Sequence, residues 1–390
     1  MNFFRLFFLL TFTLWLGCQK NTDHQIDNGE SSQIERLNLS DAELRQAVAH
    51  SPADNIEATL QKVSQTLDLI YAEEMPEYLP NWIAFHTVLM YGEHAYPNFR
   101  VGNDTDENQN LKRIFAILQN SDTQENGAFV LRSGSPYPRH SGPYFMQEHH
   151  PDQFLHYFGM SGGTLDAPLT IDGKEYTFQN VLDRSLLEAR TANELAYTVL
   201  VYAKILEPSK QWQNKFGETV SLAILLEKLL KTPERTCLGT HRLSALARVY
   251  ARKELSADKE IDKLWSELER QVFEALVLLK QSQRPDGGFE PPGKTPGLQT
   301  QEHSDIYYTG HSLEWITFLG EDYCQDDWVI RAVDHLAGIT DAIYKQTYRN
   351  LDAAKTPDAH FDFDGLCHAV SALKRWHDPV LASRERSAAE

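Results

Sequence analysis

The feature that most constrains the fold is an alternation of two kinds of apolar helical segment. Segments of the first kind carry a single apolar stripe, as in residues 56–70, where aliphatic side chains recur every three or four positions. Segments of the second kind are apolar on all sides, as in residues 194–206. A striped helix keeps one face in water, whereas a helix that is apolar all round is buried on both sides.

Twelve segments follow this alternation. The striped ones are residues 56–70, 110–119, 179–189, 219–230, 261–281 and 327–346, and the more buried ones are 81–92, 151–159, 194–206, 240–251, 311–319 and 366–376. The pattern predicts an all-α fold, an α/α toroid of about six helical hairpins with an inner and an outer ring. Irregular solenoid packing of the same hairpins is the alternative. One small β-hairpin insertion is expected at residues 169–178, where Asp172-Gly173 suits a two-residue turn.

The N-terminus resembles an export signal. Arg5 precedes an apolar run at residues 6–16 that is too short to span a bilayer, and Leu16-Gly17-Cys18 resembles the end of a bacterial lipobox. We therefore assign residues 1–18 to a lipoprotein-type signal peptide with Cys18 as the lipidation site, 19–50 to a polar tether and a short helix, 51–378 to the toroid domain and 379–390 to a disordered tail. The protein is expected in the bacterial cell envelope, anchored to the membrane by its lipid and facing the periplasm or the exterior. Ordinary secretion is the alternative.

Charge and cysteine usage exclude two further classes of protein. The chain has 37 basic and 55 acidic residues, a formal net charge of −18, which argues against a nucleic-acid partner because such binding depends on phosphate neutralisation. Cys237, Cys324 and Cys367 show no close spacing. They are therefore expected to be buried free thiols and not a disulfide framework or a zinc finger.

One stretch carries a family resemblance. Residues 277–290 resemble the Gln-rich, Gly-aromatic motif of terpenoid cyclases and protein prenyltransferase β subunits. The matching residues are Gln281, Asp286, Gly287, Gly288 and Phe289, with a looser copy at Gln119, Gly127 and Phe129. In those families the motif links an outer to an inner helix of an α/α toroid. The glycines permit a tight turn, and the aromatic ring fills the gap between hairpins.

The catalytic motifs of those families are not matched. Residues 305–309 resemble the prenyltransferase segment Asp-x-Tyr-His-Thr, but Tyr308 stands where the zinc-binding His belongs. Residues 360–365 resemble the Asp-x-Asp-Asp proton donor of class II terpene cyclases, with Gly365 in place of the last Asp. The resemblance therefore implies the scaffold and leaves the chemistry open. A divergent isoprenoid-processing enzyme is one alternative.

Histidines near the starts of apolar segments predict a site. Because the inner helices of a toroid run parallel, His241, His311 and His368 are expected to share one rim of the central hollow, where imidazole groups can transfer protons near neutral pH. The candidate acid–base residues are His311, His241, His368, Asp305, Glu314, Asp362 and Asp364. The candidate substrate-binding residues are His149, His150, His156, Tyr307 and Tyr308. Capping or core hydrogen bonding is the alternative for each histidine, and helix capping for the Asp362–Asp364 pair.

The cofactor stays unknown, although a histidine cluster with Asp305 could bind zinc or another divalent ion. The long stretch 126–152 is expected to form a lid over the pocket. These features predict an envelope enzyme that acts on a glycan or a related polar substrate in a His/Asp-lined pocket. The alternative is a non-catalytic lipoprotein that binds a ligand or a protein.

Overall fold

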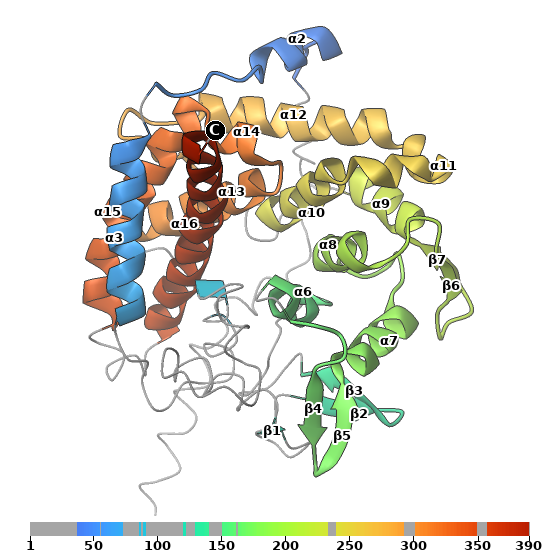
Figure 1. Cartoon of the computed structure of the whole chain (residues 1–390). Helices are drawn as coiled ribbons and strands as arrows, with labels where there is room; N and C mark the ends of the chain where they lie inside the picture. Colours follow the sequence, from blue (N-terminus) through green and yellow to red (C-terminus); the bar gives the residue numbers. More distant parts are fainter. Residues whose placement is uncertain are drawn as a thin grey trace, which may run out of the picture.

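The computed structural model describes residues 37–54, 56–72, 86, 89–90, 120–121, 129–139, 150–160, 163–232, 239–291, 301–348 and 357–389. Within these ranges the protein is mostly helical, with small β-hairpins (Figure 1). No helix in these ranges is long and apolar enough to cross a bilayer. The predicted signal peptide with Cys18, most of the tether and the striped segment 110–119 lie outside the described residues.

The longer helices form two series. The central series is α6 (Gln153–Met160), α8 (Ala196–Ile205), α10 (Thr240–Ala251), α13 (Gln301–Thr317) and α16 (Pro357–Ala389). The peripheral series is α7 (Phe178–Glu188), α9 (Leu222–Lys231), α12 (Trp265–Gln281) and α15 (Asp327–Tyr348). Each central helix contacts the next one in this order, and the peripheral helices pack on α6, α8, α10 and α13 respectively (Figure 1). The remaining helices are α2 (Asp41–Ala47), α3 (Glu57–Ala72), α11 (Lys259–Asp262), α14 (Glu321–Cys324) and the short 3₁₀ helix Lys253–Ala257.

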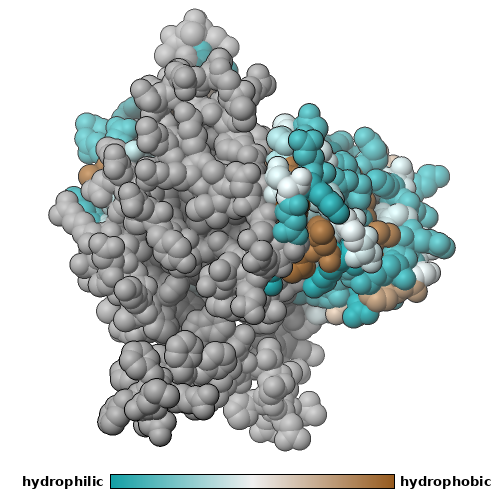
Figure 2. All heavy atoms as spheres, turned by 90° about the horizontal axis from the view of Figure 1, so that it is seen from below, coloured by the Kyte–Doolittle hydropathy of each residue, from teal (hydrophilic) through white to brown (hydrophobic). Residues whose placement is uncertain are grey.

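Burial follows the predicted alternation. The residues Ala196–Ala203 of α8 are all buried, whereas α12 buries one face through Leu268, Val272 and Leu276 and leaves Leu278 38% exposed. The apolar pattern therefore distinguished these two kinds of helix correctly, because the number of buried faces decides how apolar residues are spaced along the helix. On the face shown in Figure 2, the described surface is largely hydrophilic with a few hydrophobic residues among it.

Three antiparallel strand pairs lie at the edge of the helical body. β4 (Pro168–Ile171) pairs with β5 (Lys174–Thr177), and the turn residues Asp172 and Gly173 have φ of 49° and 73°. Two positive φ angles are those of a type I′ turn, so the predicted hairpin is confirmed. β2 (Phe129–Arg132) pairs with β3 (Ser135–Pro138), β6 (Gln211–Gln213) pairs with β7 (Thr219–Ser221), and β1 (Asn120–Ser121) joins β4 in parallel. Only one hairpin was predicted, so the β2–β3 and β6–β7 pairs depart from that prediction.

Two central helices start earlier than the sequence predicted. The predicted segments start just after Gly310 and Gly365, but α13 begins at Gln301 and α16 at Pro357, about three turns before. The glycines are contact points and not helix ends. A Cβ atom at Gly310 would lie 3.0 Å from the backbone of Ala369, and one at Gly365 would lie 3.0 Å from the side chain of Ile306. Glycine thus lets α13 and α16 approach closely.

The C-terminal stretch also differs from the prediction. Residues 379–390 were assigned to a disordered tail, but α16 continues to Ala389 and contains Pro379. Val380 is fully buried, so this part of the helix packs on the body. Among the cysteines, Cys324 and Cys367 are buried free thiols as predicted, and Cys237 lies outside the described residues.

The Gly-aromatic stretch forms the turn after α12. Phe289 is fully buried, its ring lies 5.9 Å from that of Trp328 on α15, and its N–H donates to Thr309 Oγ1 on α13 at 3.2 Å. The ring therefore packs against α15 while the backbone of Phe289 is bonded to α13, so this residue lies at the junction of the two helices.

We expect Gly287→Ala to lower the free energy of unfolding by about 2 kcal/mol or more, because a non-glycine residue there is strained. Gly287 has a φ of +95°, and its added Cβ would lie 2.4 Å from the carbonyl oxygen of Arg331. Chemical denaturation would measure the loss. The matched control is Gly217→Ala, where φ is +80° but nothing lies within 4 Å of the added atom. Equal losses in the two variants would contradict the proposed clash.

Candidate functional site

A buried carboxylate–imidazole pair lies between α13 and α16. His368 Nδ1 donates to Glu314 Oε2 at 2.6 Å, and both residues are at least nine-tenths buried. The Nε2 atom of His368 lies 3.4 Å from the hydroxyl of Tyr157 on α6. The close approach of α13 and α16 at their glycines makes this contact possible.

The hydrogen bonds continue from Tyr157 to two further helices. The Tyr157 hydroxyl lies 3.2 Å from the hydroxyl of Tyr197 on α8, which in turn lies 3.1 Å from His241 Nε2 on α10. Glu314, His368, Tyr157, Tyr197 and His241 thus form one chain of hydrogen bonds across five helices, which we call the relay. Every group in it can donate, accept or exchange a proton.

The charges at the two ends of the relay differ. Burial alone would raise the pKa of Glu314, but the attraction of protonated His368 and the hydrogen bond from its ring outweigh burial and hold the pKa below its usual range. Burial lowers the pKa of His241 well below its usual range, and neighbouring histidines lower it further. Glu314 is therefore an anion and His241 is neutral at pH 7.

One ring nitrogen of His241 has no hydrogen-bond partner among the described residues. This atom, Nδ1, is buried, while Nε2 is bound to Tyr197. A buried ring nitrogen without a partner costs free energy unless a ligand or water completes it. The relay therefore ends at an atom suited to a bound molecule.

His311 lies between the two ends. Its ring centroid is 3.8 Å from that of His368 and 5.7 Å from that of His241, so the structure brings the three predicted histidines together. His311 Nδ1 donates to the carbonyl oxygen of Tyr307 at 2.9 Å, which leaves Nε2 as the acceptor of the neutral ring. His311 lies in the middle of α13 and His368 within α16, so only His241 of the three histidines lies at a helix start.

The predicted binding histidines lie beside this cluster. The His150 ring is 4.9 Å from that of His241, and the His156 ring is 5.4 Å from that of Tyr197. His149 lies outside the described residues. Of the predicted tyrosines, Tyr307 lies with its ring 4.4 Å from that of His311.

Two other sets of predicted residues contribute no described contact to the cluster. Tyr308 is half-buried, and burial raises its pKa to about 12. Asp362 and Asp364 fall within α16, but their side chains are not among those described.

Asp305 does not share the histidine site. Its carboxylate accepts hydrogen bonds of 2.7 and 2.6 Å from Arg284, on the turn after α12. Asp305 and His311 are six positions apart on one helix and so point in different directions. The predicted association of Asp305 with the histidine cluster therefore differs from the structure.

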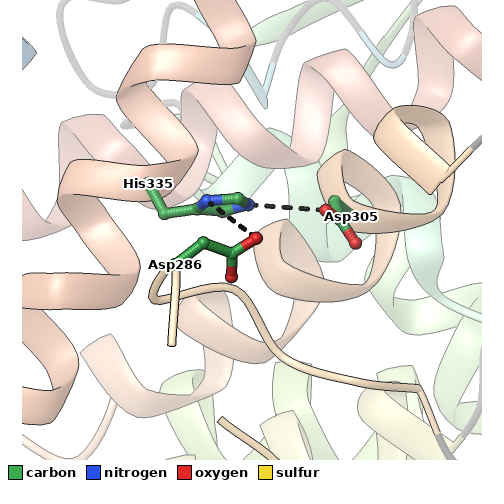
Figure 3. A group of neighbouring side chains, drawn as sticks. All are labelled: Asp286, Asp305 and His335. Atoms are coloured by element: carbon green, nitrogen blue, oxygen red, sulfur yellow. Dashed lines mark ion pairs between the residues drawn. The ribbon is translucent and has the colours of Figure 1, made fainter. Parts of the chain in front are cut away.

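The Asp305 group has some features of a metal site. Asp286, Asp305 and His335 each offer a ligand atom, and these atoms lie within 4.8 Å of one another (Figure 3). However, Arg284 bridges the two carboxylates, with an N–O distance of 3.1 Å to Asp286. One guanidinium already supplies the positive charge that a metal would bring, so the residues do not fit a metal ion in this arrangement.

We expect Arg284→Gln to destabilise the protein by about 2 kcal/mol, because the buried Asp305 carboxylate loses its charged donors. We also expect Mn²⁺ or Zn²⁺ to raise the melting temperature of this variant and not that of the wild type. The matched control is Arg331→Gln, whose exposed ion pair with Asp327 contributes little. A similar metal-dependent rise in the wild type would contradict this interpretation.

The sequence analysis missed the two tyrosines that complete the relay. Tyr157 lies in a segment predicted as a short buried helix and Tyr197 in one predicted to be apolar on all sides. A buried hydroxyl in such a helix is the signal that could have found them. His86 was not among the predicted site residues, but its ring lies 6.1 Å from that of His368.

A pocket of about 300 Å³ lies next to the relay. Its lining is Arg132, Tyr137, Pro151, Glu188, Arg190, Asn193, Glu194 and Phe216. Glu194 Oε2 lies 3.6 Å from His150 Nδ1, and the His150 ring lies 4.9 Å from that of His241, so His150 connects the pocket lining to the end of the relay. Arg132, Tyr137 and Pro151 belong to the stretch 126–152 that was predicted as a lid. Its function as a lid stays a prediction.

Comparisons with family models, with curated proteins and with solved structures return no match for this chain.

Proposed function

We propose that this protein is an enzyme that uses the relay for general acid–base catalysis on a glycan or a related polar substrate. The observation that carries the proposal is the continuous hydrogen-bonded path from the ionised, buried Glu314 to His241. Purely structural histidines would each bond to local backbone in a separate environment. Here a carboxylate, two imidazoles and two phenols instead share one path.

The Glu314–His368 pair supplies the base. The carboxylate orients the imidazole through Nδ1 and stabilises its protonated form, so that Nε2 can accept a proton and return it. Tyr157 lies at that nitrogen and carries the proton onward as a hydroxyl group. His241, neutral and with Nδ1 directed away from Tyr197, is the group that meets the substrate at the other end.

The pocket supports a polar, ring-shaped substrate. Tyr137 and Phe216 supply aromatic surface, and Arg190 and Asn193 supply hydrogen-bond donors around it. A volume of about 300 Å³ is at the lower end for small-molecule sites and suits one or two sugar units.

Elimination fits the described groups better than two-carboxylate hydrolysis. Glycosidases commonly need two carboxyl groups on either side of the scissile bond. The relay contains one, held by His368, and of the two carboxyl groups that line the pocket, Glu188 pairs with Arg184 and Lys215 while Glu194 lies beside His150. In an elimination, the base removes a C–H proton, the electron pair forms the double bond, and a hydroxyl group protonates the departing oxygen. The imidazole of His241, at the end of the relay, suits the removal of the proton, and the two tyrosine hydroxyl groups behind it can pass a proton along the path.

We further propose the α/α toroid for the scaffold and the lipid-anchored envelope for the location. The ordered contacts of the central helices and the buried Phe289 at the junction of α13 and α15 support a toroid related to terpenoid cyclases and prenyltransferase β subunits. The lipobox-like Leu16-Gly17-Cys18 supports the anchor.

The test is a turnover assay on a panel of neutral and acidic glycans with the wild type and Glu314→Gln. Elimination would appear as new absorbance near the wavelength of a conjugated double bond, and hydrolysis as new reducing ends. Wild-type turnover that is lost in the variant supports the proposal. Glycan binding without any turnover would favour the non-catalytic lipoprotein instead.

A further inference from the structure

Two arginines from different elements line the pocket. Arg132 is the last residue of β2, just before the turn at Ser133 and Gly134, and Arg190 follows the end of α7. The β2–β3 hairpin lies against α7, which brings the two arginines to one cavity of about 300 Å³ (Figure 1). Both side chains are half-buried.

Each arginine lies against an aromatic ring of the same lining. Val130 is opposite Tyr137 in the β2–β3 pair, so Arg132, two positions later, lies diagonal to Tyr137 on the same face. The guanidinium carbon of Arg132 lies 4.0 Å from the centroid of the Tyr137 ring. That of Arg190 lies 4.7 Å from the centroid of the Phe216 ring. Contact with a ring face holds a cation in place and supplies no acceptor oxygen to it.

Neither guanidinium group has a carboxylate partner among the described residues. That of Arg132 forms no hydrogen bond within this part of the chain, and that of Arg190 forms one, from Nε to the amide oxygen of Asn193 at 3.2 Å. The Asn193 amide donates in turn to the carbonyl oxygen of Glu188 at 3.3 Å. Because a guanidinium group carries five N–H donors, most of the donors of both arginines stay open to a ligand.

The carboxylates of the lining, in contrast, are already bound. Glu188 accepts from Arg184 and pairs with Lys215 at 2.5 Å. Burial alone would raise the pKa of Glu188, but the hydrogen bond from Lys215 and the charge of Arg184 outweigh burial and hold the pKa below its usual range. Glu194 accepts from the N–H of Ala196 at 2.7 Å. Neither carboxylate therefore neutralises the two arginines of the lining.

One further carboxyl group lies close by in the chain. Asp152 follows the lining residue Pro151, is buried, and accepts from Thr198 Oγ1 at 2.6 Å. Burial raises the pKa of Asp152 above its usual range, which favours its neutral form. The cations in and beside the lining therefore outnumber its anions, and a bound anion would offset their mutual repulsion.

The pocket lies beside the reacting end of the relay and does not contain it. His241 is not among the described lining residues, and His150 stands between, 3.6 Å from Glu194 and with its ring 4.9 Å from that of His241. A ligand whose anionic group lies in the pocket would thus present a neighbouring part of itself to His241. In an oligosaccharide, that neighbouring part is the next sugar unit.

We propose that Arg132 and Arg190 bind the carboxylate of a uronate, an acidic sugar unit, next to the unit that reacts at His241. This inference rests on the proposed function and names its substrate class. Planar guanidinium groups bind carboxylates through paired N–H donors. The rings of Tyr137 and Phe216 supply flat surface for the sugar ring, and the cavity has room for one or two units.

The experiment is a calorimetric titration of the full chain with oligomers of galacturonate, glucuronate and mannuronate, each beside its own methyl ester. The ester keeps the sugar and removes the charge. We expect one or more of the acids to bind about 10²-fold more tightly than the ester, with affinity that falls as salt rises. Each of Arg132→Gln and Arg190→Gln should weaken binding of the acid about tenfold and leave binding of the ester unchanged, since each removes charged donors.

Two control variants and one further ligand make the result decisive. Arg331→Gln removes an exposed arginine of α15 outside the lining and should keep wild-type affinity for the acid. Arg132→Lys keeps the charge and should bind the acid more tightly than Arg132→Gln, which separates lost charge from a disturbed hairpin. Equal binding of every acid and its ester would overturn the inference, as would wild-type affinity in both glutamine variants. Tighter binding of dextran sulfate than of any uronate would also overturn it, in favour of a sulfate site.

Turnover separates this inference from the proposed function. Glu314→Gln should keep the preference for the acid over its ester and lose turnover. Turnover retained in Glu314→Gln would overturn the proposed function and leave the uronate site in place. Equal binding of acid and ester, with turnover lost in Glu314→Gln, would overturn the uronate site alone.

Discussion

Glu314→Gln is expected to lower turnover by about 10²- to 10⁴-fold while the protein still folds, because general acid–base groups contribute that much to rates. The glutamine side chain is nearly isosteric and still reaches His368 Nδ1, but it has no charge to stabilise the protonated imidazole. The loss should appear in kcat more than in KM, since Glu314 holds His368 and does not line the described pocket.

The matched control is Glu274→Gln on α12. Glu274 is also buried, and it pairs with Arg270 at 2.9 Å. Both residues lie on α12, a helix that contributes no residue to the relay. The Glu274→Gln variant should lose a similar amount of stability and keep wild-type turnover. If both variants lost turnover equally, the effect would come from general destabilisation and the relay would have no special role.

The same carboxylate predicts a pH dependence of stability. The pKa of Glu314 in the folded protein is below its usual range, so its ionised form stabilises the folded state. That contribution is fully present above the unfolded pKa of about 4.3 and is lost as the pH falls through the lower folded pKa. The stability difference between wild type and Glu314→Gln should therefore shrink below about pH 4.

Phe289→Ala is expected to lower the free energy of unfolding by about 3 to 5 kcal/mol, the usual cost of removing a fully buried aromatic ring. The ring packs against α15 and the backbone of Phe289 is bonded to α13, so loss of the ring also loosens the helix that carries His311 and Glu314. Denaturant unfolding would measure the change. Phe216→Ala is the control, because that ring is 47% exposed and should cost far less. A small loss at Phe289 would show that the neighbouring helices do not depend on this ring.

Local patterns predicted much of the architecture. The striped and buried helices and the Asp172-Gly173 turn follow from periodicity and turn chemistry. The starts of α13 and α16 did not follow. Gly310 and Gly365 look like helix ends in sequence, and only the partner helix shows that they are sites of close approach.

The sequence predicted the three clustered histidines, but not the hydrogen bonds that link them to other side chains. His241, His311 and His368 were predicted together because each was placed near the start of an apolar segment, although only His241 lies at a helix start in the structure. The side chain that Asp305 pairs with could not be known, because Arg284 lies on a different element. Tyr157 and Tyr197 resemble core residues until their hydroxyl groups are seen to meet.

The close approach of α13 and α16 has a consequence for the newly made chain. Glu314 and His368 are 54 positions apart, and α16 is the last element that the structure describes. A growing polypeptide therefore carries the carboxylate on α13 well before the imidazole exists, and the pair can form only after α16 has left the ribosome and docked on α13 at Gly310 and Gly365. Ribosome-bound fragments that stop before residue 368 would have the pocket-lining residues without the pair that is proposed to act on what the pocket holds.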